Sequence, residues 1–375
     1  MQAGRQRANA AQAVVILVAA LLVLWAWRAD LAWFERHVYP GYCAVSHGQT
    51  VWPTVARILA LLVAAALVLF ARPRLARWAE RSSAVDLALV GAAIGAALVV
   101  SELLLRRHPV GDATPLTRKD MPKAIADPRV GWRFAPSQAF AFAVRGRRVE
   151  YAIDRDGDRA PRVDSRIDPA RPTLIVAGES IAFGESLPWN DTFAARLGAE
   201  LDLQVVDVGV PAYGSDQAFQ RAMEALARVK KPVALVTVFV PQLVRRNGLT
   251  SRPHLTLSDG LLVPVAAEDH LALTRLWRDE PYHGDRALDL TRAVLAATVR
   301  RAREHGAAPL FVVTNFGAAC SDDAWLLRTL FAEAGLPHVR VTLGPGETIG
   351  GGDLHPNALG ARKLAAAAAA ALRAR

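Results

Sequence analysis

The stretch TLIVAGESIAFG, residues 173–184, decides how the second half of this chain folds. Residues 174–177 are all apolar, as expected of a short strand that is buried on both faces of a parallel sheet. Gly178 and Ser180 follow at once, where the strand runs into a turn. A serine at that corner directs its hydroxyl away from the sheet, where a substrate can reach it. Ser180 is therefore our candidate nucleophile.

Downstream of this stretch, short apolar runs alternate with helical segments. The runs predict strands at 203–208, 233–240, 310–313 and 339–342, and the segments between them predict helices at 191–201, 215–229, 285–306, 321–335 and 357–373. This alternation predicts an α/β domain whose parallel sheet is covered by helices on both faces. Ligands of such sheets bind beyond the carboxyl ends of the strands. Four candidate site residues follow predicted strands: Ser180, Ala212, Gln242 and Asp353.

A base for Ser180 is found near the end of the sequence, in Asp353-Leu-His355-Pro-Asn357. A serine hydroxyl needs a base to take its proton, and histidine is the usual one, held in place by a carboxylate. Each residue also has a structural interpretation, since Ser180 and Asp353 can cap helices and Asn357 can be the N-cap of the last one. We favour catalysis because the motifs occur in one order within one α/β domain. The turn at 208–214 is expected to donate an N–H to the oxyanion.

The region before this domain divides into a linker and a small β element. Residues 108–130 are polar and contain several prolines, which predicts a linker, and 131–171 contains predicted strands at 140–144 and 149–153. The main domain then occupies 172–375. Residues 241–283 interrupt its alternation with a predicted hairpin through Asp259-Gly260. This insertion either overhangs the strand ends and shapes a pocket or is a surface loop.

The first 107 residues are typical of a membrane region with about three transmembrane helices. The candidate spans are 8–27, 51–71 and 87–105, and about 20 apolar residues match the hydrocarbon core. The alternatives are a signal peptide for the first run and a buried helical hairpin for the other two. Against a signal peptide, Trp25, Trp27 and Arg28 occupy the place of a cleavage site.

Charged loops give the expected orientation. The loop between the second and third runs is rich in arginine, and positively charged loops stay in the cytoplasm; its arginines are Arg72, Arg74, Arg77 and Arg81. The N-terminus is then also cytoplasmic, and the domain after residue 106 is periplasmic, on the outer side of the inner membrane. Four tryptophans near the proposed outer interface support this: Trp25, Trp27, Trp33 and Trp52.

Composition excludes several other classes of function. The formal charge is +10, but the arginines are scattered and not gathered on one face with aromatic residues, so we expect no nucleic-acid binding. Cys43 and Cys320 lie in separate regions, which argues against a disulfide, and no Cys/His spacing is typical of a metal site. No glycine-rich loop is suited to a phosphate. We therefore expect neither a cofactor nor a metal.

Four blocks of the sequence resemble those of the SGNH (GDSL-like) hydrolase family. GESIAFGE at 178–185 resembles the nucleophile block, and DVGVPAYGSDQ at 207–217 resembles the second block. VFVPQLVRRN at 238–247 and DLHPNALG at 353–360 resemble the third and the last. The likeness covers residues 131–375, because 131–136 and 153–159 are similar to the lead-in of envelope members of the family.

This chain departs from the family pattern in one spacing and at three places in its residues. One residue separates Asp353 from His355, where two are common, although a single residue also occurs in similar enzymes. Glu179 replaces the usual aspartate before the nucleophile, Ala212 stands at the oxyanion glycine, and Pro241-Gln242 replaces an Asn-Asp pair. The resemblance implies that the N–H of Ala212 and an amide, from Gln242 or from Asn247, stabilise the oxyanion.

The resemblance also implies a fold and a function. The fold is an SGNH-type, flavodoxin-like three-layer domain, with Ser180 as nucleophile, His355 as base and Asp353 orienting His355. The function is that of a membrane-anchored serine esterase or O-acyltransferase acting on ester-linked acyl groups, such as acetyl groups, of cell-envelope glycans or on small esters. A membrane protein that supplies the acyl group is included among the expected partners. The alternative is a catalytically degenerate SGNH-fold protein that binds glycans or acts as a scaffold in the envelope.

Overall fold

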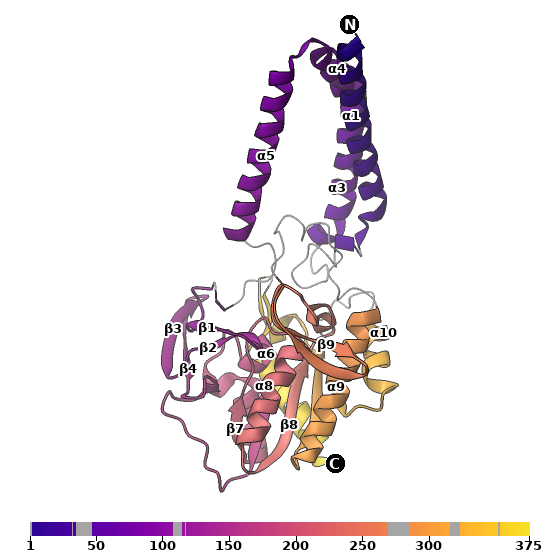
Figure 1. Ribbon diagram of the computed structural model, residues 1–375. Coiled ribbons are helices and arrows are strands. Elements are labelled where there is room, and N and C mark those ends of the chain that lie inside the picture. The colour runs from indigo at the N-terminus through magenta and orange to yellow at the C-terminus, as the bar shows by residue number, and fades with distance from the viewer. Residues whose placement is uncertain are drawn as a thin grey trace. The chain divides into compact units, whose positions relative to one another are not determined.

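A computed structural model describes residues 2–31, 33–34, 47–107, 115–116, 118–268, 285–315, 323–351 and 353–375 (Figure 1). These residues divide into two compact units. The first contains the described residues up to Arg107, and the second contains those from residue 115 onward. Cys43, Cys320 and residues 269–284 lie outside the described residues.

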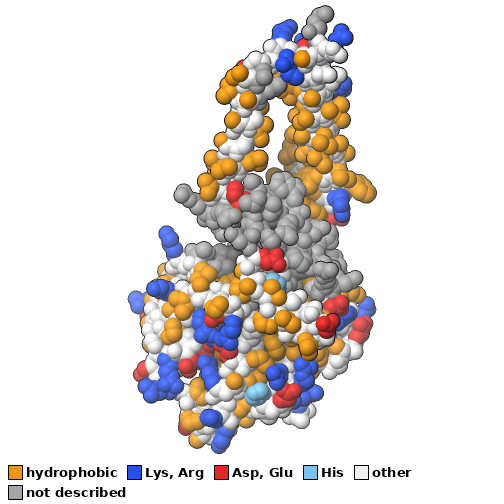
Figure 2. All heavy atoms as spheres, in the orientation of Figure 1, with side chains coloured by type: hydrophobic (Ala, Val, Ile, Leu, Met, Phe, Trp, Pro, Cys, Tyr) orange, Lys and Arg blue, Asp and Glu red, His pale blue; other side chains and the backbone are white. Residues whose placement is uncertain are grey.

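The first unit consists of helices whose apolar side chains are mostly exposed. They are α1 (Gln2–Arg28), the continuous stretch of α3 (His47–Ala66), the π-helical η1 (Leu67–Ala71) and α4 (Arg72–Arg81), and finally α5 (Ala84–Arg107). Figure 2 shows hydrophobic side chains along the surfaces of these helices. Apolar surface of this extent requires an apolar partner, and on helices of this length it favours a membrane.

Two of these helical stretches are long and apolar enough to cross a membrane. They are Gln2–Arg28, with 27 residues, and Thr50–Arg81, with 32. The third predicted span forms α5, but its apolar part, Ala88–Leu104, falls in the shorter class of 10–17 residues. Asp86 in the first turn of α5 and Glu102 near its end interrupt the apolar run. The described helices therefore favour a membrane anchor by length and composition, and the three-span topology stays a prediction.

Aromatic side chains gather where α1 ends. The rings of Trp25 and Trp33 meet edge to face with centroids 5.7 Å apart, and Phe34 lies 5.3 Å from Trp33. At the same level, Arg57 of α3 donates a hydrogen bond from Nε to the carbonyl oxygen of Ala26 at 2.6 Å. Tryptophan rings and a snorkelling arginine at one end of apolar helices are typical of a membrane interface.

Among the described residues, the second unit is built on an eight-stranded sheet in the order β12-β11-β8-β6-β7-β5-β4-β3 (Figure 1). Its parallel strands are β6 (Thr173–Ala177), β7 (Gln204–Asp207), β8 (Pro232–Phe239), β11 (Ala308–Asn315) and β12 (His338–Thr342). Counted along the chain, they follow the flavodoxin-like order 2-1-3-4-5. Every residue of β6 is buried, as its apolar sequence requires. The predicted α/β fold with a flavodoxin-like parallel sheet is confirmed.

Helices cover both faces of the parallel strands. One face is packed by α8 (Ser215–Arg228) and α9 (Asp285–Glu304), and the other by α7 (Phe193–Leu201) and α11 (Ala358–Arg373). On the α8–α9 face, a core cluster joins sheet and helices through Ile175, Val206, Leu235, Ala222, Leu226 and Ala302. The helical segments α10 (Asp323–Leu327) and η5 (Arg328–Ala332) precede β12. The second unit thus has the expected three layers.

The small β element before the main domain is divided between two sheets, because three of its strands continue the main sheet and two form a separate antiparallel pair. It contains β1 (Ala124–Asp127), β2 (Gly131–Phe134), β3 (Gln138–Val144), β4 (Arg147–Ile153) and β5 (Arg159–Ala160). The predicted strands at 140–144 and 149–153 are β3 and β4. β5 joins β4 to β7, with Arg159 opposite Asp207, so antiparallel strands extend the parallel sheet without a break.

Aromatic packing connects this β element to the nucleophile's helix, α6 (Ser180–Phe183). Phe183 lies with its ring centroid 5.1 Å from Phe134 and 5.0 Å from Tyr151. Trp132 meets Tyr213, in the turn after β7, at 5.5 Å. These residues share one buried cluster. The β element therefore supports the two turns that the sequence predicts to form the site.

Two further features of the second unit are the hairpin of the insertion and a surface hollow. The predicted hairpin is formed by β9 (His254–Ser258) and β10 (Leu261–Val265), with positive φ at Asp259 and Gly260 as its two-residue turn requires.

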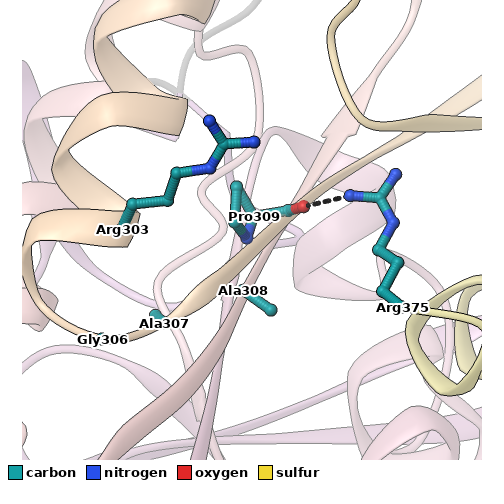
Figure 3. A pocket seen from close by; sticks show the side chains of 6 residues that line it. All are labelled: Arg303, Gly306, Ala307, Ala308, Pro309 and Arg375. Carbon is teal, nitrogen blue, oxygen red and sulfur yellow. Dashed lines mark hydrogen bonds between the residues drawn. The ribbon is translucent and has the colours of Figure 1, made fainter.

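A surface hollow of about 570 Å³ lies where α9 ends and β11 begins. In this hollow, Arg375 donates a hydrogen bond to the carbonyl oxygen of Pro309 at 3.0 Å (Figure 3). The hollow lies at the amino end of β11, whereas Ser180 lies at the carboxyl end of β6.

A buried ion-pair network fastens the β element to α8. Asp158 is almost inaccessible and pairs with Arg221 at 2.6 Å and with Arg228. Arg221 also pairs with Glu224, which accepts a hydrogen bond from Arg133 at 2.8 Å. Taking charges out of water is costly, so each buried charge depends on its partners.

Asp158→Ala is expected to lower the free energy of unfolding by about 3–5 kcal/mol, because it leaves the buried Arg221 without its main counter-charge. Thermal unfolding of the detergent-solubilised full chain measures this as a fall in Tm. Asp164→Ala is the matched control, since Asp164 pairs with Arg162 on the exposed surface, and its Tm should stay that of the parent. Equal Tm values for the two variants would contradict the structural role of the buried network.

Candidate active site

The turn after β6 places Ser180 at the carboxyl edge of the sheet. β6 lies between β7 and β8, where the strand order reverses and where ligands bind in open α/β sheets. Gly178 makes the turn with φ +147°, and a Cβ there would come within 3.0 Å of the Ala182 side chain and 3.1 Å of the Val238 carbonyl oxygen. Only glycine fits this turn, and Ser180 begins α6 two residues later.

His355 and Asp353 reach Ser180 from the other end of the sequence. His355 Nε2 lies 2.7 Å from Ser180 Oγ, and His355 Nδ1 lies 2.6 Å from Asp353 Oδ1. The backbone N–H of His355 donates to the same Asp353 oxygen at 2.9 Å. Serine, histidine and carboxylate therefore form the continuous chain that nucleophilic catalysis by serine requires.

A short antiparallel ribbon carries Asp353 and His355. It pairs β13 (Thr348–Gly350) with β14 (Asp353–Pro356), so Asp353 starts a strand of its own and does not directly follow a strand of the main sheet. Residues at i and i+2 of a strand project from the same face, which explains how one intervening residue suffices. Asn357 caps α11, as predicted, by accepting from Leu359 and Gly360.

Arg145 fastens this ribbon to the β3–β4 hairpin. It occupies the hairpin turn with φ +47°, and its guanidinium donates to the carbonyl oxygen of Gly350 at 2.5 Å. A Cβ on Gly351 would collide with the same guanidinium, so the glycine makes room for it. The positive charge of Arg145 also favours the ionised form of Asp353.

Two more carboxylates surround the nucleophile. The Ser180 hydroxyl donates to Glu179 Oε2, and Glu179 Oε1 accepts from the N–H of Ile181 at 3.1 Å. Glu185 Oε2 lies 3.7 Å from His355 Nε2. Both glutamates are only 6% exposed, so their charges are poorly screened by water.

These carboxylates set the protonation of the histidine. Burial by itself lowers the pKa of His355, but the hydrogen bond to Asp353 and the charges of Glu185, Asp353 and Glu179 outweigh it and raise this pKa to about 9. Burial raises the pKa of Asp353, whereas the hydrogen bond and charge of His355 lower it, and the net direction is down. At neutral pH the resting site then holds an imidazolium that donates to Ser180, whose own hydroxyl proton points at Glu179.

The turn after β7 lies against α6 and presents the first oxyanion candidate. The N–H of Val210 donates to the carbonyl oxygen of Gly178 at 3.2 Å, which joins this turn to that of the nucleophile. Ala212 has φ +66°, the left-handed conformation that favours glycine and costs an alanine about 1–2 kcal/mol. Its N–H donates no hydrogen bond to the described part of the chain. Ala212 thus has a backbone conformation that glycine adopts readily, although it carries a Cβ.

The two candidates for the amide of the oxyanion hole, Asn247 and Gln242, differ in what the structure describes of their side chains. Asn247 is fully buried, and its amide donates to Thr291 Oγ1 at 2.7 Å while its oxygen accepts from the N–H of Asp216 at 3.2 Å. These contacts connect α8 and α9 and engage both ends of the Asn247 amide. Gln242 lies in η3 (Pro241–Arg246), directly after β8, and its side chain is outside the described residues.

The structure adds residues that sequence reasoning missed. Glu185 lies inside the quoted block, but no motif indicates that its carboxylate faces the histidine. Arg118 pairs with Glu185 at 2.7 Å, and Arg145 holds Gly350 from 205 positions away. Among the described residues, no cluster of three His, Cys, Asp or Glu side chains is arranged to hold a metal ion.

The strand order and the placement of Ser180, Asp353 and His355 define an SGNH-like hydrolase fold, as the resemblance of the four blocks implied. Serine, histidine and carboxylate each lie within hydrogen-bond distance of the next, as nucleophilic catalysis by serine requires.

Several solved structures are similar to part of this chain. A member of the lipolytic protein G-D-S-L family from Veillonella parvula is 13% identical, with TM-score 0.33 over 52% of this chain and 96% of that one. An acetyl xylan esterase from the rumen bacterium Butyrivibrio proteoclasticus is 12% identical, with TM-score 0.32 over 59% and 67%. A GDSL-like lipase from Bacteroides thetaiotaomicron is 11% identical, with TM-score 0.32 over 56% and 91%. No protein-family model and no curated protein matches the sequence.

The pH dependence of turnover tests the electrostatics of the site. Only the neutral imidazole accepts a proton from Ser180, so kcat/KM for an uncharged ester should rise with pH and reach half its limit near pH 9. Asp353→Asn removes one carboxylate that retains this proton. Its midpoint should move to lower pH, and its limiting rate should fall roughly 10²–10⁴-fold. A parent midpoint at the ordinary histidine value of 6.5 would contradict the carboxylate cluster.

Proposed function

We propose that this chain is a membrane-anchored serine esterase or O-acyltransferase. The observation that supports it best is the hydrogen-bonded chain from Ser180 Oγ to His355 Nε2, at 2.7 Å, and from His355 Nδ1 to Asp353, at 2.6 Å. Ser180 is the nucleophile, His355 the base, and Asp353 the carboxylate that orients His355.

The proposed reaction has two halves. Ser180 Oγ attacks the acyl carbonyl as its proton passes to His355 Nε2, and the oxyanion forms near the N–H of Ala212 and the amide that Gln242 can supply. The ester bond then breaks, and the leaving oxygen takes the proton from Nε2, which leaves an acyl-serine. Water or a second hydroxyl then gives its proton to Nε2 and attacks the acyl carbon. The bond from this carbon to Ser180 Oγ breaks, and Oγ takes the proton back from Nε2. Water as acceptor makes the chain an esterase, and a sugar hydroxyl makes it a transferase.

The substrate class is carried over from the family resemblance. It consists of ester-linked acyl groups, such as acetyl, on glycans of the cell envelope, or of small esters. A transferase would in addition need a donor of acyl groups, for which a membrane protein is the proposed partner.

A second candidate function is glycan binding without turnover. Ala212 is in a strained backbone conformation, and the hydroxyl of Ser180 is engaged by Glu179. Both features favour a degenerate site in which the fold is kept for recognition. Glycan binding by the full chain, with no Ser180-dependent turnover at any pH between 6 and 10, would establish it.

Ser180→Ala tests the nucleophile. A fluorophosphonate probe should label the full chain in detergent at alkaline pH, and the substitution should abolish both labelling and release of acetate from an acetyl ester. Ser258→Ala is the control, since Ser258 lies exposed in β9 and should keep both signals. Acetate release that survives Ser180→Ala would overturn the proposal.

We further propose the topology that places the site outside the cytoplasm. The N-terminus and the arginine-rich α4 are cytoplasmic, the second unit is periplasmic, and the inner membrane is crossed by α1, by residues 51–71 and by α5. The support is the length and apolar character of the helices together with the arginines of α4.

Reporter fusions test this topology. Alkaline phosphatase, which is active only outside the cytoplasm, should be active when fused after residue 110 and inactive when fused after Ser83, between α4 and α5. A green fluorescent protein that folds only in the cytoplasm should give the opposite pattern. Phosphatase activity at both points would mean that α5 does not cross the membrane, and would refute three spans.

A further inference from the structure

Glu185 has a buried carboxylate that the proposed reaction does not yet use. Its Oε2 lies 3.7 Å from His355 Nε2, the nitrogen that exchanges protons with the nucleophile. Its Oε1 is held by Arg118 at 2.7 Å. The side chain is only 6% exposed. One oxygen is therefore fixed from behind while the other is directed at the reactive face of the histidine.

The backbone around Glu185 is fixed to the nucleophile. The N–H of Glu185 donates to the carbonyl oxygen of Ser180 at 3.0 Å, which closes the turn after α6. The next N–H, of Ser186, donates to the hydroxyl of Tyr151 at 2.8 Å. Tyr151 is itself buried and covered by the guanidinium of Arg159 at 4.2 Å. The position of the Glu185 carboxylate thus follows from the same packing that positions Ser180.

We propose that Glu185, oriented by Arg118, is a positioning residue that stabilises the imidazolium form of His355 at Nε2, as Asp353 does at Nδ1. The inference rests on the proposed function, in which this imidazolium forms during each half of the reaction. As the bond from Ser180 Oγ to the acyl carbon forms, the serine proton moves to Nε2, and the positive charge then lies between two carboxylates. Glu185 takes no proton. The proton on Nε2 passes to the leaving oxygen when the ester bond breaks.

Four other charged groups act on His355, directly or through a neighbouring carboxylate. Asp353 comes from β14, and Glu179 from the turn before α6. Arg145, from the β3–β4 hairpin, acts on Asp353, and Arg118 stands behind Glu185. Of these groups, Glu185 is the one whose carboxylate lies beside Nε2 without bonding the serine, so its removal changes the charge at Nε2 and leaves the nucleophile's own hydrogen bonds in place.

A purely structural role for Glu185 is the competing explanation. Arg118 also binds Asp120, at 2.6 Å, and this pair of bonds could simply tie the segment before β1 to the α6 turn. That role needs only Oε1 and predicts no effect on the protonation of His355. The two explanations therefore separate on the titration of His355 and not on stability.

The decisive experiment measures the titration of His355 directly in the full chain. Deuterium exchange at the imidazole C2 position, followed by mass spectrometry of the peptide that contains His355, reports the protonation midpoint without any need for turnover. Glu185→Gln keeps the shape and the oxygen that Arg118 binds but removes the charge. Its midpoint should move down by about one pH unit. Glu185→Asp, which keeps the charge, should restore most of the parent value.

Matched controls isolate the effect. Asp120→Asn removes the other carboxylate bound to Arg118, half-exposed and not in contact with His355, and should leave the His355 midpoint unchanged. The exposed His305 serves as an internal reference in every variant. An unchanged His355 midpoint in Glu185→Gln would overturn the proposal, whatever happens to the rate.

Turnover gives a second readout that separates the two proposals. With an uncharged acetyl ester, Glu185→Gln should lower kcat several-fold, keep KM near the parent value and shift the pH profile in the same direction as the exchange midpoint. If the parent shows no Ser180-dependent turnover, the proposed function fails, and the exchange measurement still decides the role of Glu185. If turnover depends on Ser180 but the His355 midpoint ignores Glu185, only the present inference fails.

Discussion

The glycine turn at the end of β6 is the constraint on which the rest of the second unit depends. A Cβ at Gly178 has no room between α6 and β8, and Gly209, in the next turn, lies so close to α6 that a Cβ there would fall 2.6 Å from the N–H nitrogen of Phe183. Both strands can therefore end against the same short helix. That close approach brings Ser180 and the Ala212 turn to one spot, beside which the β13–β14 ribbon delivers His355.

The β element before the main domain completes this arrangement. Its strands extend the sheet beyond β7, its aromatic residues pack on Phe183, and its buried Asp158 binds α8. Tyr151 and Arg118 reach the turn that carries Glu185, and Arg145 reaches the ribbon that carries the base. The site is thus assembled from both ends of the second unit, and the β element is as much a part of it as the parallel strands are.

Local patterns in the sequence were sufficient to predict many of the strands and helices and the main candidate site residues. The apolar run 174–177 predicts β6, Asp259-Gly260 predicts its hairpin, and the four blocks place Ser180 and His355 in one site, because each signal lies within a few residues. Contacts between distant residues leave no such signal. No sequence pattern marks Arg145 and Gly350 as partners, because their hydrogen bond exists only in the folded chain. A strand of two residues, such as β5, is too short to show the alternation of apolar and polar residues that predicts a strand. The third span, 87–105, stays a prediction, because the apolar part of α5 is short and Asp86 and Glu102 lie at its two ends.

The ribbon β13–β14 has one more consequence. Because Asp353 and His355 sit on one face of a single strand, they form a rigid block, and Glu179, Ser180 and Glu185 form another on the α6 turn. The triad is therefore built from two segments, which meet where His355 Nε2 contacts Ser180 Oγ. A shift of the ribbon relative to the α6 turn would separate His355 Nε2 from both Ser180 Oγ and Glu185 Oε2, while each segment kept its internal hydrogen bonds. Activity therefore depends on the relative position of two segments that are each held together locally.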